Sequence, residues 1–253
     1  MAVIQEAYIQ GISTRSVDDL VKAMGMSGIS KSQVSRLCAD IDERVKAFLD
    51  RPLEGDWPYL WLDATYIKTR QGGRIVSVAA IVAVAVNAQG RREVLGLAIG
   101  PSEAETFWTD FLRALTRRGL RGVKLVISDA HEGLKAAAAK VLGATWQRCQ
   151  FPLAQNAIHH APSLAIRKRI GGELRQVWNA PNLPVAEENL RQLVVSYRDK
   201  AAKLAQWLED NVPEGLAVFT LPEHHRRRLR TSNPMERAIQ QEIKRRTIKV
   251  RVF

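Results

Sequence analysis

The sequence is poor in cysteine and in long apolar runs. Two cysteines among 253 residues exclude a disulfide-stabilised scaffold and favour a reducing compartment. The longest apolar run, residues 76–86, is interrupted only by Ser77 and is far shorter than the roughly 20 residues of a membrane-spanning helix. The first residues carry no secretory signal pattern. We therefore expect a cytoplasmic protein that does not enter a membrane.

Acidic residues are also in deficit. The chain has 26 Asp and Glu against 38 Lys and Arg, a net charge of +12. The excess is concentrated in residues 223–253, which hold ten basic and three acidic residues, whereas residues 1–50 hold six and seven. Clustered cations favour a polyphosphate partner, because neutralised phosphates release condensed counterions. A solvated basic helix would explain the same composition.

Residues 1–52 have the pattern of a helix-turn-helix DNA-binding region. Residues 16–19 and 30–33 both show the capping-box spacing, and a glycine-bearing turn at residues 25–29 separates them. We expect short helices here, the second of which offers polar side chains to a major groove. These side chains are Lys31, Ser32, Gln33, Ser35 and Arg36. An ordinary helical hairpin is the alternative.

The middle of the chain changes from strands to helices. Turn residues separate three strands, at residues 59–69, 74–86 and 91–99, which predicts an antiparallel meander. A helix, a strand, a helix and a strand then follow at residues 102–118, 123–128, 131–142 and 144–149. Residues 150–230 have no strand pattern, and an apolar stripe at residues 190–208 indicates helix.

This order predicts an α/β fold with a mixed sheet of the ribonuclease H-like type, which includes retroviral integrases. Residues 57–149 form the first part of the catalytic core, and residues 150–230 form an all-helical insertion. Residues 231–253 begin a final basic helix, with Asn233 as its cap and Pro234 at its first position. Fold analogy does not by itself assign chemistry.

Three carboxylates are candidates for one site. Asp63 lies inside the apolar first strand, Asp129 follows the fourth strand, and Glu236 lies in the first turn of the last helix. Each has a structural alternative: Asp63 in an ion pair, Asp129 as a helix cap, and Glu236 bonded back to the Asn233 cap. The topology brings all three to one end of the sheet. Such an all-oxygen site suits two Mg²⁺ or Mn²⁺ ions, which support phosphoryl transfer.

Six ordered motifs resemble the Mutator-type transposases of bacterial insertion sequences. They are Gly-Ile-Ser-Lys-Ser-Gln-Val-Ser-Arg, Trp-Leu-Asp-Ala-Thr-Tyr, Ser-Asp-Ala-His-Glu-Gly-Leu, Trp-Gln-Arg-Cys, Thr-Ser-Asn-Pro-Met-Glu-Arg and Glu-Ile-Lys-Arg-Arg-Thr. The resemblance covers nearly the whole chain. It implies a DDE transposase that cleaves and joins DNA at insertion-sequence ends, with Asp63, Asp129 and Glu236 holding two catalytic Mg²⁺ or Mn²⁺ ions.

The resemblance also implies partners and a location. Double-stranded DNA, as terminal inverted repeats and as target, is the expected partner, and pairing of two ends implies a homo-oligomer. We expect the protein at the bacterial nucleoid. The expected DNA contacts are Lys31, Ser32, Gln33, Arg36, Arg237, Lys244, Arg245 and Arg246.

The chain departs from the family pattern in three respects. Pro152 replaces a His that usually follows Cys149 by three residues, Gln240 replaces an Asn, and family members are commonly longer. We interpret the chain as a copy truncated at both ends. The alternative function is therefore an inactive module that binds DNA or inhibits full-length transposase. A nuclease for RNA–DNA hybrids fits the fold but leaves the insertion unexplained.

Two smaller hypotheses concern the insertion. Cys149 with His159 and His160 is a weak zinc pattern, since a second ligand pair is missing. Trp178 and Trp207 could stack on a flipped base, although such tryptophans more often pack between helices.

Overall fold

A five-stranded mixed sheet lies at the centre of the part of the chain that the computed structural model describes. That part comprises residues 30–230 with a few positions on either side: Asp19, Lys22, Ala23, Gly25, Ile239, Gln241 and Glu242. The strands are β1 (Tyr59–Gln71), β2 (Arg74–Val86), β3 (Arg92–Gly100), β4 (Leu125–Ser128) and β5 (Thr145–Arg148). They are ordered β3-β2-β1-β4-β5 across the sheet.

The predicted meander is confirmed. β1 and β2 pair antiparallel along their whole length, and the hairpin closes at the pair Gln71 and Arg74. Gly72 and Gly73 form its turn with φ of +54° and +79°, a backbone conformation that other residues rarely adopt. β3 adds antiparallel to β2, whereas β4 pairs parallel to β1 and β5 parallel to β4.

The two faces of the sheet have separate hydrophobic cores. Side chains alternate along a strand, so Leu60 and Leu62 pack on one face and Trp61 on the other. The face with Leu60 is covered by α4 (Glu105–Arg117) and α5 (Glu132–Leu142). The face with Trp61 packs against the segment that follows β5.

That segment is the predicted helical insertion, and residues 150–230 contain no strand. Its helices are α6 (Gln150–His160), α7 (Leu164–Trp178), α8 (Leu183–Arg198), α9 (Ala202–Asn211), η1 (Val212–Gly215), η2 (Ala217–Thr220) and α10 (Glu223–Leu229). The apolar stripe at residues 190–208 is carried by two helices, because α8 ends at Arg198 and α9 begins at Ala202.

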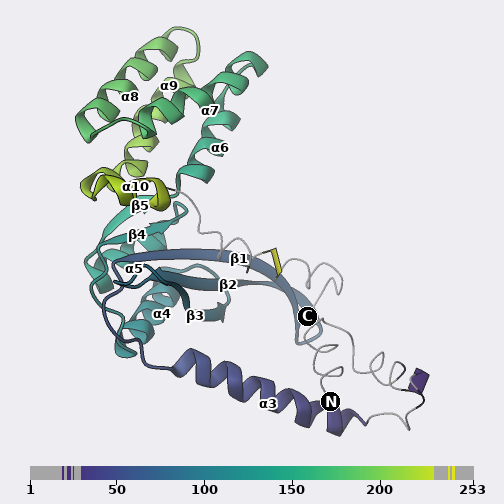
Figure 1. Ribbon diagram of the computed structural model, residues 1–253. Coiled ribbons are helices and arrows are strands. Elements are labelled where there is room, and N and C mark those ends of the chain that lie inside the picture. The colour runs from purple at the N-terminus through teal and green to yellow at the C-terminus, as the bar shows by residue number, and fades with distance from the viewer. Residues whose placement is uncertain are drawn as a thin grey trace.

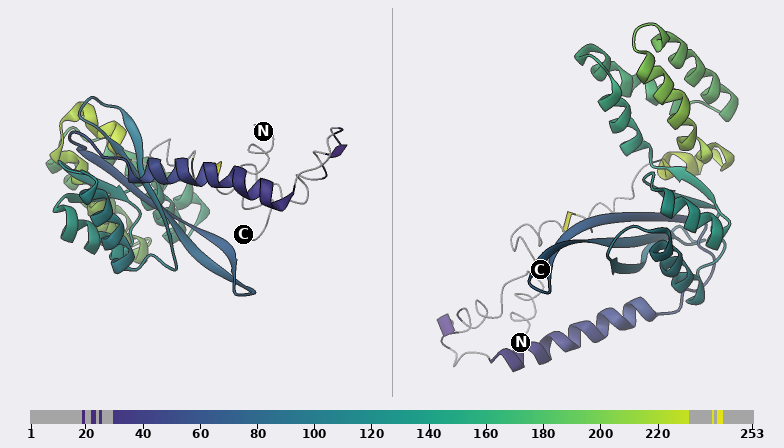
Figure 2. Two further views of the ribbon diagram at one scale, coloured as in Figure 1. Left: turned by 90° about the horizontal axis from the view of Figure 1, so that it is seen from below. Right: turned by 180° about the vertical axis from the view of Figure 1, so that it is seen from behind.

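Before the sheet, α3 (Lys31–Asp50) is one helix of 20 residues, longer than the short helices that we predicted. The predicted capping box is present: the Ser30 side chain accepts from the Gln33 backbone, and the Gln33 side chain accepts from the Ser30 backbone. α3 and the insertion project from opposite sides of the sheet (Figures 1 and 2). The first helix of the predicted helix-turn-helix lies outside the described residues. None of the helices within the described residues has both the length and the apolar composition of a membrane span.

Candidate active site

Asp63 and Asp129 lie on neighbouring parallel strands of the sheet. In the β1–β4 ladder Tyr59 pairs with Leu125 and Trp61 with Ile127. Asp63 of β1 and Asp129, the residue that follows β4, each come two residues after the last of these pairs. Adjacent strands are about 4.8 Å apart. The two predicted aspartates therefore follow the paired segments of neighbouring parallel strands.

Asp63 lies on the face of the sheet that packs on the insertion. Side chains two residues apart share a face, and Trp61 and Ile127 both belong to the core that packs on the insertion. Asp63 is half-buried, while the side chain of Asp129 is exposed. β1 continues past the end of β4 as part of the long hairpin (Figure 1). The two carboxylates thus lie at the edge where the paired part of β4 ends.

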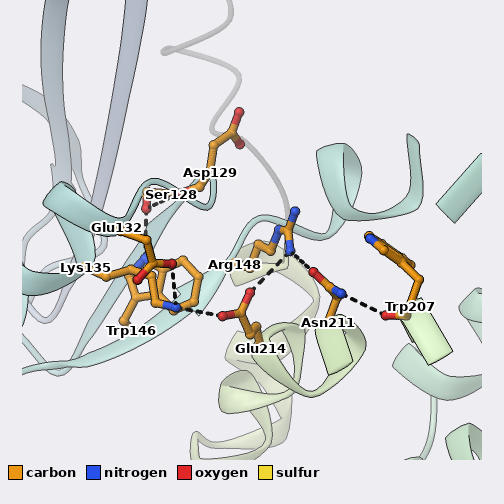
Figure 3. A network of polar contacts seen from close by, with 9 residues as sticks. All are labelled: Ser128, Asp129, Glu132, Lys135, Trp146, Arg148, Trp207, Asn211 and Glu214. Carbon is orange, nitrogen blue, oxygen red and sulfur yellow. Dashed lines mark hydrogen bonds and ion pairs between the residues drawn. The ribbon is translucent and has the colours of Figure 1, made fainter. Parts of the chain in front are cut away.

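The alternative role of Asp129 as a helix cap is wrong. The cap of α5 is His131, whose side chain makes no capping hydrogen bond. The carboxylate of Asp129 has no hydrogen bond or ion pair to any described residue, and Figure 3 shows it directed away from Lys135 and Glu214. Partial desolvation raises the pKa of Asp129, Arg148 opposes this change, and Glu103 adds to it. Asp129 is thus an exposed residue whose carboxylate makes no hydrogen bond to the described protein.

A short chain of hydrogen bonds holds the backbone at Asp129. The indole Nε1 of Trp146 donates to Ser128 Oγ at 2.8 Å, and this hydroxyl donates to the carbonyl oxygen of Asp129 at 2.9 Å. Lys135 Nζ lies 4.6 Å from the centre of the Trp146 ring and adds a cation–π contact. β5 therefore positions the residue that follows β4 (Figure 3).

Arg148, the last residue of β5, joins the sheet to the insertion. Only 8% of it is exposed, and its Nη1 donates to Asn211 Oδ1 at 2.9 Å and to Glu214 Oε2 at 3.2 Å. The other oxygen of Glu214 accepts from Lys135 of α5 at 2.7 Å. Glu214 thus links two cations from different elements, and one of these cations, Arg148, acts electrostatically on Asp129.

Two buried glutamines connect the end of the insertion to the sheet, a role that the sequence analysis missed. Gln147 of β5 donates through Nε2 to Leu229 O at 3.2 Å, and its Oε1 accepts from the Val218 backbone. Gln150 Nε2 donates to Gly215 O at 2.8 Å, and the Gln150 backbone donates to Arg230 O at 2.9 Å. In the sequence, the only indication of this role was that the two polar residues lie in and just after a short predicted strand. Through these bonds Arg230 lies beside the end of β5, and the predicted Glu236 is six residues further along the chain.

Several predicted residues lie outside the described part of the chain. Glu236 is one of them, and the others are Arg237, Lys244, Arg245 and Arg246. Nothing is described of the Lys31 side chain, whereas Ser32, Gln33 and Arg36 are exposed on the first turns of α3. The first turns of α3 lie far from β4 (Figure 1).

The donor chemistry of the two aspartates suits a hard divalent cation. Mg²⁺ and Mn²⁺ prefer carboxylate oxygens, which Asp63 and Asp129 provide at the end of two neighbouring strand segments. Within the described residues no three His, Cys, Asp or Glu side chains are grouped to hold a metal ion. The predicted third ligand, Glu236, lies outside that part.

The zinc hypothesis fails on geometry. Cys149 is the residue before α6, and His159 and His160 end this 11-residue helix. At 1.5 Å per residue the cysteine and the histidines are about 15 Å apart, too far to share one ion.

The two tryptophans of the insertion pack within the protein. Trp178 is 6% exposed in the core of the insertion. Trp207 stacks on His160 with 5.0 Å between ring centres. The structure therefore favours the packing role for both.

The described residues form a mixed α/β structure, in which the strand that holds Asp63 pairs in parallel with the strand that precedes Asp129 and a helical insertion follows the last strand. The chain matches the model of the family described as "Transposase, Mutator family" over residues 1–253. It belongs to the Mutator family of transposases, as its motifs predicted.

Named relatives agree with this assignment. The chain is 45% identical over 253 residues to the transposase for insertion sequence element IS406 of Burkholderia multivorans, a match that covers 99% of the chain and 65% of the relative. It is 37% identical over 257 residues to the transposase for ISRM5 of Rhizobium meliloti, covering 100% and 63%. The chain therefore spans less than two thirds of the length of these relatives.

Similarity to solved structures is slight. The catalytic core domain of BIV integrase aligns with 58% of the chain and 80% of its own length, at 15% identity and a TM-score of 0.22. A likeness this small does not define the fold.

Proposed function

We propose that the protein is a DDE transposase that cleaves DNA at insertion-sequence ends and joins the resulting 3′ end to another DNA. The observation that carries the proposal is the parallel pairing of β1, which holds Asp63, with β4, which directly precedes Asp129. Family membership supports the same conclusion, since the relatives are insertion-sequence transposases.

The strand order supports a ribonuclease H-like fold. The sheet begins with an antiparallel meander whose first strand is central, and helices connect this meander to two further, parallel strands. This is the strand order that we predicted for that fold. The fold puts the first and fourth strands side by side, and these are the strands that carry or precede the two aspartates. We propose four regions: a helix-turn-helix region at residues 1–52, the first part of the catalytic core at 57–149, the helical insertion at 150–230 and the final basic helix at 231–253.

In the proposed reaction the protein supplies position and charge. Asp63, Asp129 and Glu236 would hold two Mg²⁺ or Mn²⁺ ions, which activate the attacking oxygen and stabilise the leaving oxygen in phosphoryl transfer. The hydrogen bonds from Trp146 through Ser128 fix the backbone of Asp129. Desolvation raises the pKa of Asp129, and Arg148 opposes this rise, so the arginine favours the ionised form that binds a cation. Double-stranded DNA is the proposed substrate, with a homo-oligomer pairing two ends.

A strand-transfer assay tests this function. The chain is incubated with Mg²⁺ and DNA that carries the inverted repeats flanking its gene, and joined products are measured. We expect Asp63→Asn and Asp129→Asn to lower joining by at least about a hundredfold, since even groups that only orient metal ligands are worth about 10–100-fold. Asp110→Asn, at an exposed aspartate of α4, is the matched control and should join normally. Joining that survives in both site variants would refute the proposal.

The same assay addresses the alternative of an inactive DNA-binding module. Pro152 occupies the first turn of α6, three residues after Cys149, where proline is tolerated but provides no ligand. An unmodified chain that binds inverted-repeat DNA without joining it, together with joining by Pro152→His, would favour the inactive module.

A further inference from the structure

A groove of about 380 Å³ lies between α6, α7 and α10 of the insertion. Three arginines line it: Arg175 of α7, Arg227 of α10, and Arg230, which follows α10. None of the described residues in its lining is acidic. A hollowed surface with charges of one sign raises the local concentration of a partner of the opposite sign. The groove therefore favours an anion.

The described protein leaves these three positive charges without a counter-ion. Arg175 and Arg227 are exposed, and their side chains make no hydrogen bond or ion pair with any described residue. Arg230 is half-buried. Its Nη1 donates to the neutral Asn179 Oδ1 at 2.5 Å, and its buried Nε has no hydrogen-bond partner among the described residues. A partly buried charge with unused donors costs free energy, which a bound anion would offset.

Phosphate is the anion that suits this groove. The planar N–H donors of a guanidinium bind two phosphate oxygens at once. Burial, Arg226 and Arg227 together lower the pKa of Arg230, so the cations at α10 act on one another. Arg175 comes from a different helix and gives a separate point of contact. Several phosphates along one chain therefore fit the groove better than a single small anion.

The position of the groove relates it to the candidate active site. Gln150 lines the groove, and its backbone N–H donates to Arg230 O at 2.9 Å. Two residues earlier, Arg148 ends β5 and pairs with Ser128, the residue before Asp129. α10 lies beside β5 (Figure 1), and Gln147 Nε2 donates to Leu229 O at 3.2 Å. The groove thus begins near the sheet edge that carries Asp129.

We propose that this groove binds the phosphate backbone of double-stranded DNA, with Arg175 and Arg227 in contact with phosphates and Arg230 adding positive charge. The proposal rests on the proposed function in taking DNA as the substrate. It assigns the insertion a part in holding the duplex beside the candidate active site. Contacts to phosphates carry no sequence information, so the groove binds inverted-repeat DNA and other DNA alike.

The salt dependence of binding tests the phosphate contacts. Fluorescence anisotropy measures the Kd of the full chain in EDTA for an inverted-repeat duplex and for a scrambled duplex of equal length. Each phosphate contact on a duplex contributes a slope of about −0.9 to log K against log salt. Arg175→Gln with Arg227→Gln should therefore make the slope shallower by about 1.8 for both duplexes. Arg175→Lys with Arg227→Lys keeps the charge and should keep the slope.

A matched control removes the same charge elsewhere. Arg113 of α4 and Arg198 of α8 are exposed and make no ion pair with a described residue. Arg113→Gln with Arg198→Gln should leave the slope unchanged. All four substituted positions are exposed, and circular dichroism checks that the variants fold.

A free anion could use the same guanidinium chemistry, and inorganic pyrophosphate is the probe for it. Isothermal titration calorimetry measures its binding to the unmodified chain and to the Arg175→Gln, Arg227→Gln variant. If this variant loses pyrophosphate binding but keeps the DNA slope, the groove is a small-anion site and the proposal is wrong.

Two other results would overturn the proposal: no binding of either duplex, or an equal change of slope in the Arg113→Gln, Arg198→Gln control. Because EDTA removes any need for catalysis, a chain that fails the strand-transfer assay can still pass this one. Failure here with normal joining would reject the groove and keep the proposed function.

Discussion

Arg148 and Glu214 form a buried ion pair between the sheet and the helical insertion, with 3.2 Å between Nη1 and Oε2. The side chain of Arg148 is 9% exposed and that of Glu214 28%. Arg148 is the last residue of β5, and Glu214 lies in η1 of the insertion. The ion pair therefore attaches the insertion to β5, the strand that pairs with β4.

Removal of Glu214 should destabilise the protein. Glu214→Ala leaves the buried charge of Arg148 without its carboxylate, and we expect the free energy of unfolding to fall by about 3 kcal/mol, at the low end for a broken buried pair. Urea denaturation measures the change. Glu188→Ala, which removes the exposed ion pair with Arg191, is the control and should cost less than about 1 kcal/mol. Equal losses for the two variants would contradict the role of the buried pair.

Loss of the Gln147 hydrogen bonds should lower the free energy of unfolding. Gln147→Leu keeps the volume but leaves the Val218 N–H and the Leu229 carbonyl without their partner, so we expect a loss of about 2–4 kcal/mol. Limited proteolysis should then cut within residues 216–230 earlier than in the unmodified chain. Gln176→Leu, at an exposed position of α7, should behave like the unmodified chain. A Gln147→Leu chain with unchanged stability would show that this contact is dispensable.

The stability contribution of Asp129 should depend on pH. Its pKa in the folded protein is raised above the ordinary 3.8, so the folded chain binds more protons than the unfolded chain between the two values. Stability is therefore lost as the pH rises through this window, and ionised Asp129 lowers stability at pH 7. We expect Asp129→Asn to raise the urea midpoint at pH 7 in EDTA, and the gain to disappear below about pH 3.8.

Asp110→Asn is the control for this measurement, since an exposed substitution on α4 should leave the midpoint unchanged. A gain for Asp129→Asn that is as large at pH 3 as at pH 7 would show that charge is not its cause.

Loss of the Trp146 indole N–H should slow the proposed reaction more than it lowers stability. Trp146→Phe keeps an aromatic ring beside Lys135 but removes the hydrogen bond to Ser128 Oγ, so the backbone of Asp129 is held less firmly. We expect a loss of about 1 kcal/mol in stability and a roughly tenfold slower rate of DNA joining. Urea denaturation and the strand-transfer assay measure the two effects. An unchanged joining rate would exclude a positioning role for Trp146.

Much of the fold could be predicted from local patterns. The second strand was predicted at residues 74–86 and is observed at Arg74–Val86, because turn residues at both ends and a continuous apolar run define a central strand. The capping box at Ser30 was also predicted, since it depends on side chains only three residues apart. The lengths of α3 and of α8 were predicted less well, because periodicity does not show where a helix stops.

The candidate site was predicted only in part. Asp63 could be predicted as a site residue because it is a charged residue within an apolar strand, and this pattern is local in the sequence. Gln147 gave no such signal, because what makes it important is its bonds to Val218 and Leu229, more than 70 residues away in the chain.

The sequence by itself determined the family, the elements and the residue types available for chemistry, since these depend on short-range order along the chain. Only the tertiary structure decided that β1 pairs in parallel with β4, that His131 and not Asp129 caps α5, and that Arg148 is buried against Glu214. The physical reason is that strand pairing and burial join residues far apart in the chain, and which pairs form depends on how the whole core packs.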